Sequence, residues 1–166
     1  MPIDIRPFEP DDWPALWPLL HAVFAQGDTY TFPSDATENA IHAAWIQAPT
    51  ATFVATNATG TILGSYYIKP NQTGNGAHVC NCGYVVAESA RGRGIASAMC
   101  AHSQTTALEL GFLAMQFNFV IATNTGAIRL WQKLGFDIVG TIPQAFRHPQ
   151  QGRVAAHIMY KWLADA

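Results

Sequence analysis

Apolar side chains recur along this chain with two different periods, and each period predicts one kind of element. Trp13, Leu16, Leu20 and Phe24 follow the spacing of a helix that buries one face. Short runs rich in β-branched and aromatic residues predict strands. The expected strands cover 3–7, 52–56, 62–68, 78–86, 112–122, 136–141 and 154–162, and the expected helices cover 13–24, 37–47, 95–110 and 124–134.

This order of elements predicts the fold class. Strands and helices alternate on both sides of a glycine-bearing loop at 89–94. Such a pattern is typical of an α/β (α+β) domain in which helices cover both faces of one mixed sheet. The chain has 166 residues and shows no repeat or linker, so we expect a single domain over 1–166.

Composition narrows the class of protein further. With 12% charged residues, a net charge of −2 and no basic stripe, the chain is not expected to bind nucleic acid. No apolar run is long enough to span a membrane, and residues 1–13 lack the pattern of a signal peptide, so we expect a cytoplasmic protein. The low charge density is compatible with a homodimer.

The three cysteines do not form a recognisable framework. Cys80 and Cys82 would lie on one face of a strand, and Cys100 lies in an expected helix. We interpret all three as small buried apolar side chains, against the alternative of a metal or redox site. No metal is therefore expected.

The loop that feeds the helix at 95–110 is the sharpest local feature. It contains Gly92 and Gly94, which permit backbone torsions closed to other residues and leave room for a close approach. The first amides of a helix have no intrahelical partner and lie at the positive end of its dipole. The loop therefore suits the diphosphate of a cofactor, with Arg91 and Arg93 adding charge at the rim.

Other readings of this loop are possible. A purely structural turn from strand to helix would have the same glycines. A Walker loop would need Gly-Lys-Ser/Thr, which Gly94, Ile95 and Ala96 do not supply. Ser97 stands where a dinucleotide fingerprint needs its third glycine, so both nucleotide readings are disfavoured.

Two motifs in register resemble the GCN5-related N-acetyltransferase (GNAT) superfamily. The first is Arg91-x-x-Gly94-x-Ala96, and the second is Asn124-x-x-Ala127 followed by a helix that ends in Gly135-Phe136. The resemblance implies a mixed, mostly antiparallel sheet of six to seven strands. It also implies a splay between the fourth and fifth strands, here 78–86 and 112–122.

The same resemblance implies acetyl-CoA as co-substrate, seated in the splay. The residues that it assigns to the cofactor are Val85, Val86, Arg91, Gly92, Arg93, Gly94, Ile95, Ala96 and Asn124. Within the superfamily, the segments at 67–71, 80–84 and 117–120 are similar to the fungal azetidine-2-carboxylate N-acetyltransferases. That likeness implies a small amino or imino acid as acceptor. Peptide or protein N-termini, and a non-catalytic acyl-CoA-binding module, are the alternatives.

The catalytic groups of many relatives are missing here. The strand at 78–86 contains no carboxylate, and Trp131 stands where relatives often carry a tyrosine. An indole N–H does not give up its proton at useful pH, so no proton donor is carried over. His78 and Glu88 flank the strand but fit surface positions, and we assign no general base, expecting proton transfer through water.

The remaining candidates are amides and one aromatic ring. We expect Asn81, Asn118 and Tyr84 to contact the acceptor, and Asn118 and Asn124 to act in catalysis. Each has a structural alternative. The amides of Asn81 and Asn118 could bond to loose backbone at the splay, Asn124 could cap a helix, and Tyr84, like Tyr30 and Phe32, could belong to the core.

Overall fold

A seven-stranded sheet forms the centre of the computed structural model, which describes residues 2–165. The strands lie in the order β1-β2-β3-β4-β5-β7-β6. All neighbours are antiparallel except β4 and β5. The strands are β1 (Asp4–Pro7), β2 (Ala51–Thr56), β3 (Ile62–Pro70), β4 (Val79–Val86), β5 (Ala114–Ile121), β6 (Asp137–His148) and β7 (Gly152–Trp162).

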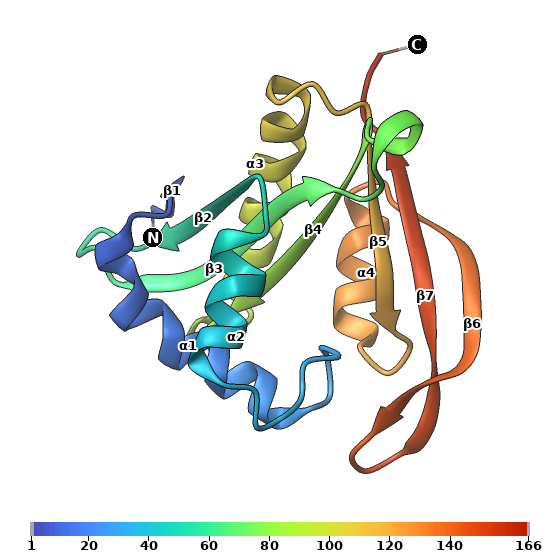
Figure 1. Ribbon diagram of the computed structural model, residues 1–166, viewed down its shortest axis with the longest axis horizontal. Coiled ribbons are helices and arrows are strands. Elements are labelled where there is room, and N and C mark those ends of the chain that lie inside the picture. Colours follow the sequence, from blue (N-terminus) through green and yellow to red (C-terminus); the bar gives the residue numbers. More distant parts are fainter. Residues whose placement is uncertain (1, 166) are drawn as a thin grey trace.

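Helices cover both faces of this sheet (Figure 1). They are α1 (Trp13–Gln26), α2 (Glu38–His42), α3 (Ile95–Glu109) and α4 (Thr125–Lys133). Buried side chains of α1 and α2 form one cluster with Val54 and Val85, whereas α3 and α4 share a larger cluster with Tyr66, Phe117 and Phe136. The predicted fold class, including helices on both faces, is confirmed.

Two elements differ from their predicted lengths. In the range expected to form one helix, 37–47, the α-helix covers Glu38–His42, and Ala43–Gln47 form a π-helical turn that follows it directly. The last two strands form a longer hairpin than predicted, because β6 continues past Pro143 to His148. The pairing register shifts between Ile142 and Phe146, where Gln144 has a φ of 52°. Proline is tolerated in such an edge strand at an irregularity, so it did not end the strand.

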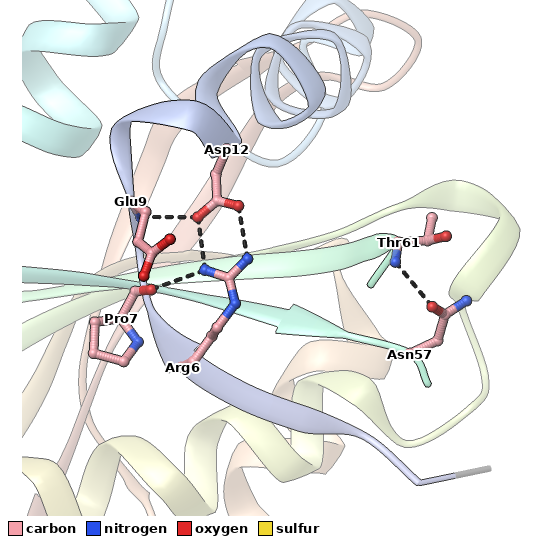
Figure 2. A network of polar contacts seen from close by, with 6 residues as sticks. All are labelled: Arg6, Pro7, Glu9, Asp12, Asn57 and Thr61. Atoms are coloured by element: carbon pink, nitrogen blue, oxygen red, sulfur yellow. Dashed lines mark hydrogen bonds and ion pairs between the residues drawn. The ribbon is translucent and has the colours of Figure 1, made fainter. Parts of the chain in front are cut away.

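The N-terminal strand is tied to the start of α1 by a charged pair (Figure 2). The Arg6 guanidinium donates two hydrogen bonds to the Asp12 carboxylate, at 2.8 and 2.7 Å. The same carboxylate accepts the backbone N–H of Glu9 at 2.8 Å. The hydrogen bond to Arg6 lowers the pKa of Asp12, so the pair stays ionised at neutral pH.

The parallel pair β4–β5 separates soon after it begins. The two strands pair only at Val79 with Ala114 and at Cys80 with Met115. At the next position, Asn81 Nδ2 donates to the carbonyl oxygen of Gln116 at 3.0 Å, so a side chain replaces the backbone pairing. This position, where the strands part, is called the fork below.

A tyrosine on β3 supports the fork from one face of the sheet. The Tyr67 hydroxyl donates to Asn81 Oδ1 at 3.2 Å. The ring lies over Gly83, where an added Cβ would come within 2.6 Å of Tyr67 Cε1. Gly83 is therefore needed for this close approach. The side-chain amide of Asn81, on β4, therefore forms a hydrogen bond to β5 and accepts another from Tyr67 on β3.

We predict that Asn81→Ala lowers the free energy of unfolding by about 1–3 kcal/mol, because it removes both hydrogen bonds and leaves the buried Tyr67 hydroxyl without an acceptor. Urea unfolding monitored by circular dichroism measures the change. Gln116→Ala is the control, since it keeps the backbone carbonyl that Asn81 binds, and it should cost less than about 0.5 kcal/mol. Equal losses in the two variants would contradict this role.

Candidate functional site

One large cavity, of about 970 Å³, opens at the fork. Its lining residues come from the loop after α1, from β3, β4, β5 and α4, from the glycine loop and from the β6–β7 hairpin. The lining residues that belong to the glycine loop and the start of α3, here called the glycine-loop end, are Arg91, Gly92, Gly94, Ile95, Ala96 and Ser97. Polar and aromatic lining residues from outside that loop, here called together the amide end, include Asp28, Thr29, Tyr30, Phe32, Lys69, Asn81, Asn118 and His148.

The glycine-loop end offers uncapped helix amides. Gly94 precedes α3 in the left-handed conformation, with a φ of 79°, and no side chain caps the helix. An added Cβ at Gly92 or Gly94 would meet nothing within 4 Å, so the approach to these amides is open. In contrast, the first turn of α4 is capped, because Asn124 Oδ1 accepts from the amide of Ala127 at 3.3 Å. The start of α3 is therefore a ready site for an anion.

The two arginines of this loop lie in different places. Arg91 is exposed and lines the cavity. Arg93 does not line it, and instead borders a smaller hollow with Pro2, Ile3 and Asn57. The charge that we expected from both side chains therefore comes to the cavity from Arg91.

Along β4, alternate residues direct their backbone toward the fork. Two hydrogen bonds show which residues of β4 bond to β3. The Asn71 amide donates to the Val79 carbonyl, and the Ala87 amide donates to the Leu63 carbonyl. With the register of the pair, the odd-numbered residues from 79 to 87 therefore direct their N–H and C=O groups toward β3. In an antiparallel pair the intervening residues face the other way. Val86 therefore directs its N–H toward the cavity, whereas the backbone of Val85 faces β3.

The amide end brings Asn81 and Asn118 to the same cavity, but their side chains differ in freedom. Asn81 is buried, with both its amide nitrogen and its oxygen bonded within the protein. Asn118 is exposed, accepts from Gln116 Nε2 at 3.0 Å and donates to Asn71 Oδ1 at 2.6 Å. Asn118, unlike Asn81, could therefore replace one of its exposed hydrogen bonds with a hydrogen bond to a ligand.

Tyr84 lies differently from what we expected. Its ring packs against Phe117 and Trp131, and its hydroxyl bonds to Ser103 at 2.6 Å. Burial raises the pKa of Tyr84 well above its usual value, so the phenol stays neutral. This ring belongs to the packing between the sheet and helices α3 and α4. Part of Tyr84 also lines the cavity, as do Tyr30 and Phe32.

Tyr30 fixes the loop that follows α1. Its hydroxyl donates to the backbone carbonyl of Tyr84 at 2.8 Å, across the fork side of β4. Its ring contacts Phe24 and Trp45, with centroids 5.1 and 5.9 Å apart. Burial raises the pKa of Tyr30 strongly, so it remains a hydrogen-bond donor.

The sequence analysis missed four residues at the amide end, namely Asp28, Thr29, Lys69 and His148. His148 Nδ1 accepts from the amides of Gln150 and Gln151, both at 3.2 Å, which leaves the ring proton on Nε2. Nothing local marks these residues. They lie in the loop after α1, at the end of β3 and in the last hairpin, and only the fold brings them together.

Two kinds of feature are absent from residues 2–165, the part of the chain that the structure describes. No group of three or more His, Cys, Asp or Glu side chains is placed to hold a metal ion. No helix among these residues is long and apolar enough to cross a membrane. The cysteines Cys80, Cys82 and Cys100 are free and buried.

Comparison with known proteins gives consistent matches. A family model described as the acetyltransferase (GNAT) family matches residues 13–136. The N-acetyltransferase aca1 of Schizosaccharomyces pombe is 40% identical over 99 residues, which are 59% of this chain and 47% of aca1. This chain therefore spans about half the length of that curated relative.

Solved structures agree over nearly the whole chain. A GCN5-related N-acetyltransferase from Kribbella flavida is 41% identical, with a TM-score of 0.92 and coverage of 97% of this chain and 98% of that one. A phosphinothricin acetyltransferase from Sinorhizobium meliloti, solved in complex with acetyl-CoA, is 18% identical. Its TM-score is 0.86, with coverage of 99% and 90%, and at this identity it shows the fold alone.

The family match covers most of the chain, and the parallel pair β4–β5 has the splay that the resemblance implied. The predicted superfamily and fold are confirmed, and the family match agrees with the expected class of enzyme, an acetyl-CoA-dependent N-acetyltransferase. The roles of individual residues, the azetidine-carboxylate likeness and the acceptor stay predictions. The chain belongs to the acetyltransferase (GNAT) family.

Proposed function

We propose that this protein transfers the acetyl group of acetyl-CoA to the amine of a small amino or imino acid by direct attack. The observation that carries the proposal is one continuous cavity. It is lined by the loop at the start of α3, whose amides are uncapped, by Val86 on β4 and by the polar residues of the amide end. A diphosphate, a thioester and an acceptor would occupy it in that order.

The cofactor would lie along the glycine-loop end. The amides from Gly92 to Ser97 would bind the diphosphate, with the positive end of α3 and the Arg91 guanidinium adding attraction. The pantetheine arm would then lie in the fork, where alternate backbone groups of β4 take it as a strand-like partner. Asn124 would face it from α4 while its Oδ1 caps that helix.

The chemistry needs few titrating groups. A neutral amine attacks the thioester carbon, the C–N bond forms, and the carbonyl oxygen gains negative charge that the Val86 N–H would stabilise. The C–S bond then breaks, and the thiolate of CoA finally takes the proton that the amine loses. The amine of a free amino or imino acid is an ammonium at pH 7, so it must first lose one proton, to water or to the protein, before its electron pair can attack.

The amide end favours an acceptor that carries a carboxylate. Lys69 is half-buried, its Nζ lies 5.3 Å from the centroid of the Tyr67 ring, and no carboxylate of residues 2–165 lies within 4 Å of it. Its charge is therefore available to a ligand. Asn118 adds an exposed amide beside it. The resemblance to azetidine-2-carboxylate acetyltransferases supports the same class of acceptor.

The loop after α1 limits the length of the acceptor. A Cβ added at Gly27 would lie 3.7 Å from Cγ of Pro149, so this loop and the β6–β7 hairpin meet beside the amide end. Tyr30 and Phe32 also line this side. A small ring fits such an enclosed end better than a peptide chain does, which is why we place peptide N-termini second.

An acceptor panel tests the proposal. L-azetidine-2-carboxylate, L-proline, the other L-amino acids and a short peptide are each incubated with acetyl-CoA. Release of CoA thiol and a mass gain of one acetyl group are followed, and we expect the highest kcat/KM for a small imino acid. Preference for the peptide would contradict the acceptor class. Stabilisation by acetyl-CoA without thiol release for any amine would contradict catalysis.

We predict that Gly94→Val raises the Kd for acetyl-CoA at least about tenfold, because the side chain strains a left-handed position and covers the amides that bind the diphosphate. Isothermal titration calorimetry measures the change. Gly60→Val is the matched control, since Gly60 also has a positive φ, of 81°, but lies in the turn between β2 and β3. A folded Gly94→Val protein with normal affinity would refute the loop assignment.

We also predict that Asn118→Ala raises the acceptor KM or lowers kcat about tenfold, because one hydrogen bond to the acceptor is lost. The Kd for acetyl-CoA should stay within about twofold. Steady-state kinetics with the best amine of the panel give both values. Asn39→Ala, which removes an exposed amide on α2, serves as the control. If cofactor affinity fell as much as acceptor affinity, Asn118 would have to be placed elsewhere.

A further inference from the structure

The amide end contains two polar side chains with buried atoms that have no partner. Asp28 and Thr29 lie in the loop between α1 and α2, and both line the cavity. Asp28 Oδ1 and Thr29 Oγ1 are buried and form no hydrogen bond with any residue of 2–165. An unpaired buried polar atom costs about 1–3 kcal/mol, and more when it carries charge. Such a cost at adjacent residues on one cavity suggests that a ligand provides the missing donor.

The protein itself does not neutralise this carboxylate. Within residues 2–165, the ion pair between Arg6 and Asp12 is the one found within 4 Å, and it lies at the other end of α1. Asp28 is also the one carboxylate among the described residues that line the cavity. Lys69, the cation of the amide end, does not pair with it. The amide end therefore carries one unpaired negative and one unpaired positive side chain.

The loop holds Asp28 in place without using its carboxylate. Two residues later, Tyr30 is anchored by its hydroxyl to the Tyr84 carbonyl and by its ring to Phe24. Because Tyr30 is fixed by these groups, the loop beside Asp28 is ordered before any ligand arrives, which lowers the cost of binding.

We propose that Asp28, together with the Thr29 hydroxyl, binds the ammonium group of the acceptor. This inference rests on the proposed function and adds the residues that determine which amines are bound. A secondary ammonium has two N–H donors, one for the Asp28 carboxylate and one for the Thr29 oxygen. A charged hydrogen bond in such a partly buried end is stronger than one in water.

The main test compares Asp28→Asn with the matched control Asp35→Asn. Asp35 is an exposed acid of the same loop that does not line the cavity. With L-azetidine-2-carboxylate as acceptor, we expect Asp28→Asn to raise KM about tenfold or more and to leave the Kd for acetyl-CoA within about twofold. Asp35→Asn should change neither value. Thr29→Val should raise KM less, about threefold.

Two further readouts separate ligand binding from a structural role. Since Asp28 Oδ1 accepts no hydrogen bond within the protein, Asp28→Asn should not lower Tm in the absence of ligand. Cyclobutanecarboxylate has the ring of azetidine-2-carboxylate without the nitrogen. As an inhibitor it should bind wild type and Asp28→Asn equally weakly, whereas the thermal stabilisation by azetidine-2-carboxylate should depend on Asp28.

The outcomes distinguish this inference from the proposed function. If amines are acetylated and Asp28→Asn behaves as Asp35→Asn does, the inference is overturned and the proposed function stands. If no amine is acetylated but binding of azetidine-2-carboxylate to the CoA-loaded protein depends on Asp28, the inference stands and the proposed function fails. If azetidine-2-carboxylate neither binds nor reacts with the wild type, the inference is overturned.

Discussion

The parting of β4 from β5 is the constraint on which the rest of this structure depends. Backbone pairing stops after Cys80 and Met115, and the Asn81 amide makes the last link to β5. Beyond it, the inward N–H and C=O groups of β4 have no strand to pair with. Such groups are costly to leave unpaired in a buried place, so the fork is stable only where side chains, water or a ligand satisfy them. The Tyr30 hydroxyl already does so for one carbonyl.

The cavity at this opening is lined by two chemically different sets of groups. On one side α3 begins with uncapped amides after Gly94, which favours an anion. On the other side, beyond the fork, lie amides and single opposite charges at Asp28 and Lys69. Aromatic rings on both faces of the sheet hold these groups in place. A cofactor with a diphosphate at one end and a reactive thioester at the other suits this arrangement, because its reactive end would reach the fork.

Local patterns predicted the fold and the turn before α3 well, but they gave no indication of which side chains line the rest of the cavity. The start of α3 and the role of Gly94 follow from a strand, a loop and a helix that are adjacent in the chain. Asn81 was correctly placed at the splay, yet whether its amide faced a ligand or the neighbouring strand depended on where Gln116 lies. The length of β6 was underestimated, because the strand continues past Pro143 through an irregular register that no local pattern indicates.

What the sequence by itself determined is the order of the elements, the family and the glycine turn before α3, because periodicity, glycine positions and motif spacing act over a few neighbouring residues. What only the tertiary structure decided is which side chains share the cavity. Asp28, Lys69, Asn118 and His148 come from four separate segments, and all four line the cavity only because of where β4 and β5 part and how the loop after α1 and the last hairpin lie. These segments are far apart in the chain, and no local pattern encodes how they are arranged in space.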